Sequence, residues 1–216
     1  ISRQIVPNVQ QYVFLDEIQN VTGFERLLEG LFILPGVDLY VTGSNAYLLS
    51  SELATLLTGR SFEINVLPFS WREYLEYTGD TSNLERQFAR YLQVGGFPEA
   101  LSLATVSDVY AGQYLQQVFN TIFENDISKR HRIYAEEAYY NVVRFLVDSV
   151  GSSVSANKIA VSLTAGGKKI DNKSVSKYIS TLVEAYLFYR TQRFDIKGKA
   201  LLQTLETYYL VDTGLR

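Results

Sequence analysis

Hydrophobic residues in the first 70 positions form short apolar runs separated by segments with helical spacing. The apolar runs are YVFL (12–15), VDLYVT (37–42) and SFEINVL (61–67), which are rich in β-branched and aromatic residues. Between them, GFERLLEGLF (23–32) and AYLLSSELATLL (46–57) place leucines at helical intervals. This alternation predicts βαβ units with a parallel sheet, and the near-continuous apolar strands predict that both faces of the sheet are buried.

After Pro68 the hydrophobic pattern becomes helical. Helical spacing predicts three helices, at roughly 70–77, 84–93 and 107–127. The sequence GGFP (95–98) interrupts them, because glycine and proline break regular helices.

The last third of the chain has a different pattern, with three shorter helices and then two strands. The helices are expected in EEAYYNVVRFLVDSVG (136–151), SANKIAVSL (155–163) and NKSVSKYISTLVEAY (172–186). The strands are expected in LFYRTQRFDI (187–196) and ETYYLVD (206–212), on either side of a loop that contains KGK. Three helices followed by a β-hairpin predict a winged helix-turn-helix.

Composition excludes several classes of site. The 216 residues include no cysteine, so disulfides and thiolate metal sites are ruled out and a cytoplasmic location is expected. The single histidine, His131, has no evident partner and leaves little room for a histidine metal cluster or a Ser-His-Asp triad. No apolar run approaches the roughly 20 residues that a membrane-spanning helix needs, so no membrane association is expected.

Two further features concern how the chain is organised. It begins at Ile1 and contains no methionine, so we expect a fragment, a processed form or an incomplete sequence. Residues 151–216 carry ten Lys and Arg against five Asp and Glu, whereas residues 1–150 carry ten against eighteen. This asymmetry predicts two units with different partners.

Two adjacent carboxylates, Asp16 and Glu17, follow the first apolar strand directly. Ligands of open α/β sheets bind at the carboxyl ends of the strands. In nucleotide hydrolases an aspartate at this place holds Mg²⁺, and a following glutamate can polarise the attacking water. From this stretch alone, two solvated acids at a strand end remain an equal alternative.

The second strand ends in Thr42-Gly43-Ser44-Asn45, where a small polar residue could orient water or contact a terminal phosphate. The alternative is that Ser44 or Asn45 caps the following helix. Arg60 lies between a helix end and the third apolar run, where its planar guanidinium could reach a phosphate in a neighbouring subunit. The alternative for Arg60 is a surface residue at a turn.

The ordered series FLDEIQNV, VTGSNAYLLSSELATLLTGR, LPFSWREYL and GGFPEAL resembles a large prokaryotic group of AAA-type ATPases with a C-terminal domain of unknown function. The resemblance spans nearly the whole chain. It implies that Asp16 and Glu17 are the Walker B pair, with Asp16 on Mg²⁺ and Glu17 on the catalytic water. It also implies that Ser44 and Asn45 occupy the sensor 1 position, that Arg60 is an arginine finger, and that GGFP is a family loop of uncertain role.

The hydrophobic pattern and this resemblance together predict an α/β fold in three parts. Residues 1–68 would be the C-terminal part of a parallel-sheet P-loop ATPase core, and residues 69–132 a helical lid or linker. Residues 133–216 would be an α+β winged-helix domain.

The phosphate-binding loop of such an ATPase is missing from these 216 residues. The pattern G-x-x-x-x-G-K-[ST] does not occur, and TAGGKKIDNKS (164–174) has neither its spacing nor its place before the Walker B strand. In the family this loop and its central strand precede YVFLDEIQ. We therefore expect either a C-terminal piece of a longer ATPase or a degenerate copy, with ATP and Mg²⁺ bound by the full-length parent and neither bound tightly by this chain.

The basic C-terminal region is a candidate DNA-binding surface. The helix at 172–186 is expected to turn five residues away from its apolar stripe: Lys173, Ser176, Lys177, Ser180 and Thr181. The hairpin adds four basic residues that could contact phosphates: Arg190, Arg193, Lys197 and Lys199. The alternative is a solvated face that packs on a protein partner.

Two hypotheses follow from these patterns. In the first, the full-length protein is an ATPase coupled to a winged helix that contacts DNA or a protein, with homo-oligomers required if Arg60 acts in trans. In the second, the winged helix binds DNA or protein on a catalytically inactive ATPase platform. A simple transcription factor would leave the ordered Walker B, sensor and arginine motifs unexplained.

Overall fold

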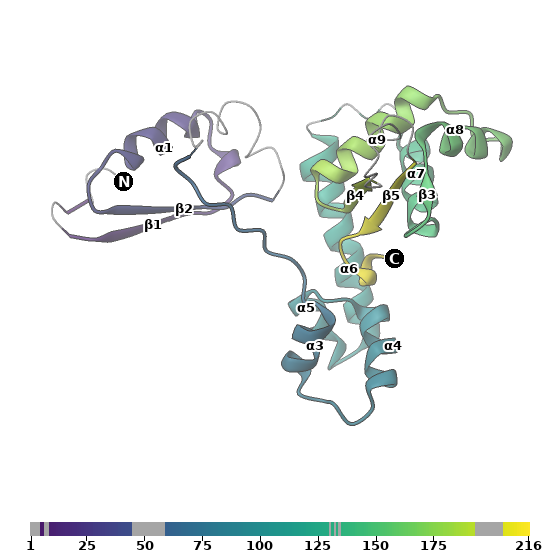
Figure 1. Ribbon diagram of the computed structural model, residues 1–216, viewed down its shortest axis with the longest axis horizontal. Coiled ribbons are helices and arrows are strands. Elements are labelled where there is room, and N and C mark those ends of the chain that lie inside the picture. Colours follow the sequence, from purple (N-terminus) through teal and green to yellow (C-terminus); the bar gives the residue numbers. More distant parts are fainter. Residues whose placement is uncertain are drawn as a thin grey trace, which may run out of the picture. The chain divides into compact units, whose positions relative to one another are not determined.

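The computed structural model describes residues 5–6, 9–44, 59–129, 131, 133, 135–192 and 205–216. The chain divides into two compact units, Ile1–Ile64 and Asn65–Arg216, and each is treated by itself (Figure 1). Asn45 and the helix predicted at 46–57 lie outside the described residues. The description resumes at Gly59 and Arg60, which form a turn. Within the described residues, no helix is both long and apolar enough to cross a membrane.

The first unit contains one βαβ element, as the hydrophobic pattern predicts. Strand β1 (Gln11–Leu15) is followed by the 3-10 turn η2 (Ile18–Asn20), helix α1 (Phe24–Phe32) and strand β2 (Val37–Val41). The two strands pair in parallel, with Gln11 opposite Val37 and Leu15 opposite Val41. Helix α1 packs on one face of this sheet, where Ile18, Phe24 and Leu28 are buried against Leu15, Leu39 and Val41.

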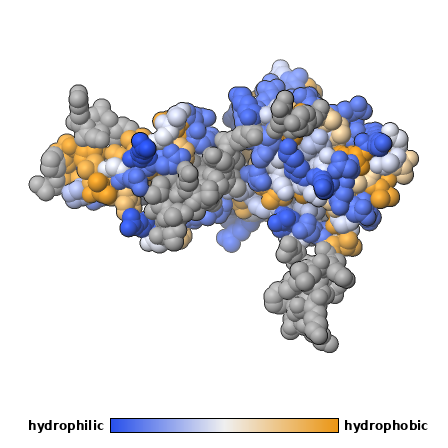
Figure 2. Space-filling model, turned by 90° about the horizontal axis from the view of Figure 1, so that it is seen from above, coloured by the Kyte–Doolittle hydropathy of each residue, from blue (hydrophilic) through white to orange (hydrophobic). Residues whose placement is uncertain are grey.

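The prediction that both sheet faces are buried is wrong for the described strands. Tyr12, Phe14 and Tyr40 point away from α1, and their side chains are 60%, 72% and 41% exposed. The rings of Phe14 and Tyr40 stack on each other, with centroids 4.9 Å apart. Figure 2 shows apolar surface, in orange, on this unit. A near-continuous apolar strand is typical of burial on both faces, so the sheet presents an aromatic face that such sheets normally cover.

The third apolar run, at 61–67, does not form the expected strand. Its side chains Phe62, Ile64 and Val66 are 88%, 69% and 89% exposed, and the segment has no regular secondary structure. An alternating apolar pattern becomes a strand only when a neighbouring strand supplies the hydrogen-bonded ladder. The described sheet of this unit contains β1 and β2 only, and the run does not join it.

The second unit begins with four helices. They are α3 (Trp71–Thr78), α4 (Leu84–Val94), α5 (Pro98–Ala104) and α6 (Asp108–Ile122), and α6 continues as the π-helical segment η4 (Phe123–Ser128). A capping box starts α3, because the Ser70 hydroxyl accepts from the Glu73 amide while the Glu73 carboxylate accepts from the Ser70 amide. The sequence pattern predicted α3, α4 and α6 but missed α5, which Pro98 begins at the first helical position.

The rest of the second unit consists of three helices and a small antiparallel sheet. The helices are α7 (Glu136–Asp148), α8 (Ala156–Ala165) and α9 (Asn172–Glu184), and the strands are β3 (Ser153–Val154), β4 (Phe188–Gln192) and β5 (Glu206–Leu210). The sheet order is β3-β5-β4. Val142, Ile159 and Leu182, one from each helix, are fully buried in a common core with Phe188 of β4. His131 had no evident partner in the sequence. In the structure its Nε2 lies 3.1 Å from Glu184 Oε2.

A buried carboxylate joins the two parts of the second unit. Asp212, just before the 3-10 turn η5 (Thr213–Leu215), is only 4% exposed and accepts hydrogen bonds from the amides of Gly96 (2.6 Å) and Gly214 (2.8 Å). Gly95 leaves the space for it, because a Cβ there would lie 1.7 Å from Asp212 Oδ1 and the φ of Gly95 is +80°. The two glycines of GGFP therefore form the binding site of the Asp212 carboxylate. This contact links η5 to the loop between α4 and α5.

Replacing Asp212 with alanine is expected to lower the free energy of unfolding by roughly 2–6 kcal/mol, because a buried and a partly buried amide each lose an acceptor at about 1–3 kcal/mol. The measurement is chemical denaturation of the parent and the variant. The matched control is Asp148→Ala, which removes an exposed carboxylate at the end of α7. Equal stabilities for the two variants would contradict the role given to Asp212.

Asp212 also predicts a pH dependence. Burial raises the pKa of this carboxyl above its ordinary value of 3.8, although the amide hydrogen bonds from Gly96 and Gly214 lower it. A raised folded-state pKa means that the folded protein binds the proton more tightly than the unfolded chain. The stability from this group is therefore present below pH 3.8 and is lost as the pH rises through the folded-state pKa.

The test compares the parent with Asp212→Asn, whose side chain does not titrate, by denaturant unfolding at several pH values upward from 3.5. Subtracting the variant removes the contributions of the other titrating groups that the two proteins share. The stability of the parent relative to the variant is expected to fall as the pH rises. A relative stability that rises instead would mean that the amide donors, and not burial, dominate the titration of Asp212.

Candidate functional site

The ends of β1 and β2 bring three polar side chains together. The strands remain paired up to this edge, where the Thr42 amide donates to the Leu15 carbonyl at 2.9 Å. The Thr42 hydroxyl then accepts from the Glu17 amide at 3.0 Å and donates to Asp16 Oδ1. Thr42 therefore fixes the carboxylate of Asp16 and the backbone of Glu17 at the carboxyl edge of the sheet, where open α/β sheets bind ligands.

Glu17 has a backbone conformation that is uncommon for a residue with a side chain. Its φ of 48° and ψ of 46° lie in the left-handed region. The turn is held by the Glu17 carbonyl, which accepts from the Asn20 amide at 3.0 Å, and by Ile18, which is buried beneath α1. Backbone strain of this kind is concentrated at functional sites, because the surrounding structure must maintain it.

Gln19 links the Glu17 carboxylate to the residue that follows β2. Its amide nitrogen donates to Glu17 Oε2 at 2.5 Å and to the Ser44 hydroxyl at 3.4 Å. Two of the predicted site positions, Glu17 and Ser44, are thus connected through a residue that sequence reasoning missed. The available signal was a glutamine two residues after the glutamate in DEIQ. Asn45, the other predicted sensor position, lies outside the described residues.

Arg60 is not part of this cluster. Its guanidinium lies over the ring of Phe32, 5.8 Å from the centroid, in a cation–π contact. Phe32 ends α1, and α1 runs back from the acid-bearing edge toward the start of β2. The structure therefore places Arg60 near the opposite edge of the same unit, away from Asp16 and Glu17.

The acid-bearing edge has the donor chemistry that Mg²⁺ prefers. The exposed carboxylate of Asp16 and the hydroxyl of Thr42 supply oxygen atoms, and Mg²⁺ is usually held by one or two carboxylates together with water and substrate phosphates. In the part of the chain that the structure describes, no three His, Cys, Asp or Glu residues gather into a closed metal site. Asp16 therefore fits an ion shared with a phosphate better than a structural metal held by protein alone.

The predicted basic surface on α9 is largely as expected. Lys173, Ser176 and Lys177 are exposed, opposite the buried stripe of Val175, Ile179 and Leu182. The placement of Thr181 on that outer face is wrong: Thr181 is 2% exposed, and its hydroxyl donates to the Tyr178 carbonyl at 2.8 Å. A threonine hydroxyl can donate a hydrogen bond to a backbone carbonyl of the preceding helical turn. A threonine at this position therefore does not require contact with solvent.

The basic residues of the hairpin are described only in part. Arg190 lies on β4 with Nη1 3.6 Å from Glu206 Oε1 on β5, so its charge is partly neutralised across the sheet. The other three predicted phosphate contacts lie outside the described residues: Arg193, Lys197 and Lys199. The described basic surface is therefore that of α9.

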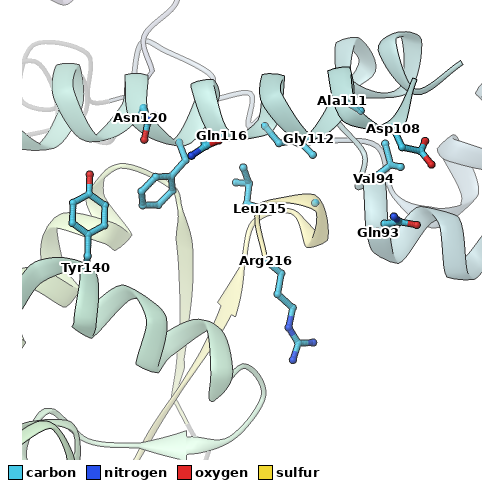
Figure 3. A pocket seen from close by; sticks show the side chains of 13 residues that line it. Gln93, Val94, Asp108, Ala111, Gly112, Gln116, Asn120, Tyr140, Leu215 and Arg216 are labelled. Carbon is cyan, nitrogen blue, oxygen red and sulfur yellow. The ribbon is translucent and has the colours of Figure 1, made fainter. Parts of the chain in front are cut away.

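A cavity of about 490 Å³ lies beside α6 in the second unit. Figure 3 shows Gln116 and Asn120 of α6, Tyr140 of α7 and the terminal Leu215 and Arg216 around it. Burial, and to a smaller extent the charges of Glu136 and Glu124, raises the pKa of the Tyr140 hydroxyl above its ordinary value. The lining offers hydrogen bonds from amides and a phenol, and the sequence did not predict it because its residues come from distant segments.

Comparison with known proteins finds two family models that match successive parts of the chain. The model of an "AAA domain" matches residues 1–75, and that of "Domain of unknown function (DUF8612)" matches residues 85–216. An uncharacterized protein of Haemophilus influenzae is 37% identical over 98% of this chain and 53% of its own length. An uncharacterized protein of Methanocaldococcus jannaschii is 27% identical over 93% of this chain and 46% of its own length. The chain thus spans about half the length of these curated relatives.

A solved structure supports the same assignment at the level of the fold. The Walker-type ATPase PABY2304 of Pyrococcus abyssi superimposes with a TM-score of 0.56 and 17% identity, over 94% of this chain and 61% of the other. The predicted resemblance is thereby confirmed by two family models in the expected order and by a shared fold. The chain belongs to the family in which an AAA domain precedes DUF8612, and it has a Walker-type ATPase fold.

Proposed function

We propose that the full gene product hydrolyses ATP with Mg²⁺ at the acid-bearing edge of β1 and β2. The observation that carries this proposal is the joint fixation of Asp16 and Glu17 by Thr42 at the end of a parallel strand pair. Phosphoryl transfer requires mainly positioning and charge stabilisation, and a pair of acids held in this way supplies the positioning. The 216 residues contain no phosphate-binding loop, so the proposal concerns the longer protein.

Each residue has a distinct part in this reaction. Asp16 holds Mg²⁺, directly or through water, and when bound the ion neutralises charge on the phosphate oxygens. Glu17 orients the attacking water and accepts its proton. Ser44 or Asn45 senses the terminal phosphate. Arg60 stabilises the developing charge from a neighbouring subunit. Its contact with Phe32 at the end of α1, away from Glu17, supports action in trans.

Glu17→Gln in the full gene product is expected to keep ATP bound while it lowers turnover by at least about a hundredfold, because the amide cannot accept the water's proton. ATP binding is measured by calorimetry and turnover by phosphate release. The matched control is Glu29→Gln on the exposed side of α1, which is expected to leave both unchanged. Parental turnover in the Glu17 variant would show that the role of Glu17 is wrong.

A second candidate function concerns the C-terminal region, which we infer to be a winged helix that binds DNA. The helix and strand order from α7 to β5, with sheet order β3-β5-β4, supports this inference. The exposed Lys173, Ser176 and Lys177 are placed on the outer face of the third helix, where they could meet phosphates. In this function the α/β unit acts either as the ATPase that drives binding or as an inactive platform.

Lys173→Glu combined with Lys177→Glu is expected to weaken DNA binding and to reduce the slope of log affinity against log salt by about two, one for each lysine. Fluorescence anisotropy with duplex DNA at several salt concentrations measures both. Arg86→Glu with Lys129→Glu, on α4 and after η4, makes the same change in net charge away from α9. Equal DNA affinity for the two double variants would exclude α9 and favour a protein partner.

A further inference from the structure

The short turn after β1 fixes Gln19 beside the acid pair. The buried side chain of Ile18 anchors the turn beneath α1, and the Ile18 amide donates to the Thr42 carbonyl at 3.3 Å. The Val21 amide closes the turn on the Ile18 carbonyl at 2.9 Å. The backbone of Gln19 is thus held from both sides, so its side chain returns toward Glu17 from a fixed origin.

The chemistry of the partners determines how the Gln19 amide is oriented. A carboxylate only accepts hydrogen bonds, so the nitrogen of the amide must face Glu17. Its two N–H groups suit the two contacts observed, a charge-assisted bond to Glu17 Oε2 and a longer one to the Ser44 hydroxyl. Gln19 therefore joins a group at the end of β1 to a group at the end of β2.

The oxygen atom of the same amide gains no hydrogen bond from this arrangement. Gln19 Oε1 is buried and has no hydrogen-bond partner within the described structure. Buried side-chain acceptors without a donor are few in folded proteins, and each needs an explanation. The amide nitrogen keeps its two contacts although the oxygen is left unpaired, which is typical of a side chain retained for what it does to its neighbours.

We infer that Gln19 is a positioning residue that fixes the Glu17 carboxylate in one orientation relative to Ser44. This inference rests on the proposed ATPase function, since Glu17 is the residue that orients the attacking water there. A carboxylate attached to a strained, left-handed backbone would otherwise rotate about its side-chain bonds. Misplacement of a catalytic group by even one ångström lowers the rate strongly, so a restraint on Glu17 acts on the chemical step.

The test uses the full gene product and the variant Gln19→Ala. The kcat for ATP hydrolysis is expected to fall about tenfold or more, in the range found when groups that orient catalytic residues are removed. The KM for ATP and its calorimetric affinity are expected to stay within about twofold, because Gln19 does not contact Asp16, which is proposed to hold the ion, and its contact with Ser44 is a long one of 3.4 Å. Gln19→Glu, of the same shape, removes both donors and faces Glu17 with a like charge, so it is expected to have a larger effect.

A second measurement separates positioning from a loss of structure. In the Glu17→Gln background, adding Gln19→Ala is expected to cause no further loss of kcat, because the group that Gln19 orients is already gone. Asn20→Ala, an exposed neighbour in the same turn, is the matched control and should leave kcat unchanged. Thermal unfolding of every variant shows whether each is folded.

The outcomes distinguish the two proposals. If the parent hydrolyses ATP and the Gln19 variants lose kcat only, both stand. If the parent hydrolyses ATP while both folded Gln19 variants keep the parental kcat, or change KM and kcat together, the role of Gln19 is overturned and the ATPase function stands. If the parent has no ATPase activity, the proposed function fails and the inference on Gln19 fails with it.

Discussion

The parallel pairing of β1 with β2 is the constraint on which the proposed chemistry depends. The ladder brings the ends of two segments together, although Asp16 and Thr42 are 26 positions apart in the sequence. Because side chains alternate along a strand, a register shift of one residue would turn Leu15 and Val41 out of the α1 core. The same hydrophobic packing that fixes the register therefore fixes the distance between the acid pair and Thr42.

The second unit depends on a different interaction, the burial of one carboxylate between two glycine-containing segments. Asp212 accepts from Gly96 and Gly214, and the Thr213 hydroxyl donates to the Tyr91 carbonyl at 3.1 Å. The four-helix segment and the C-terminal region are thereby linked by hydrogen bonds as well as by apolar contacts.

Local patterns in the sequence predicted most of the elements. Helical spacing found α3, α4 and α9, and apolar runs found β1 and β2, because these segments satisfy their preferences within a few residues. The run at 61–67 failed as a strand, since a strand also needs a neighbour that no local pattern supplies. The acids were found from their place after a strand, and Thr42 was noted only as part of the polar end of the second strand. Gln19 and the bonds of Thr42 to the acid pair were not predicted, because they arise from hydrogen bonds between separate segments. The same holds for the hydrogen bond between Gly96 and Asp212, which lie 116 positions apart in the sequence.

The aromatic face of the first unit has a consequence for handling the protein. Tyr12, Phe14 and Tyr40 form a contiguous apolar surface on a two-stranded sheet. Such a surface attracts a like surface on another molecule, and salts that strengthen hydrophobic association increase this attraction. Concentrated solutions of this chain will therefore be colloidally less stable in sulfate than in chloride, and a mild detergent that coats the aromatic rings will counter their self-association.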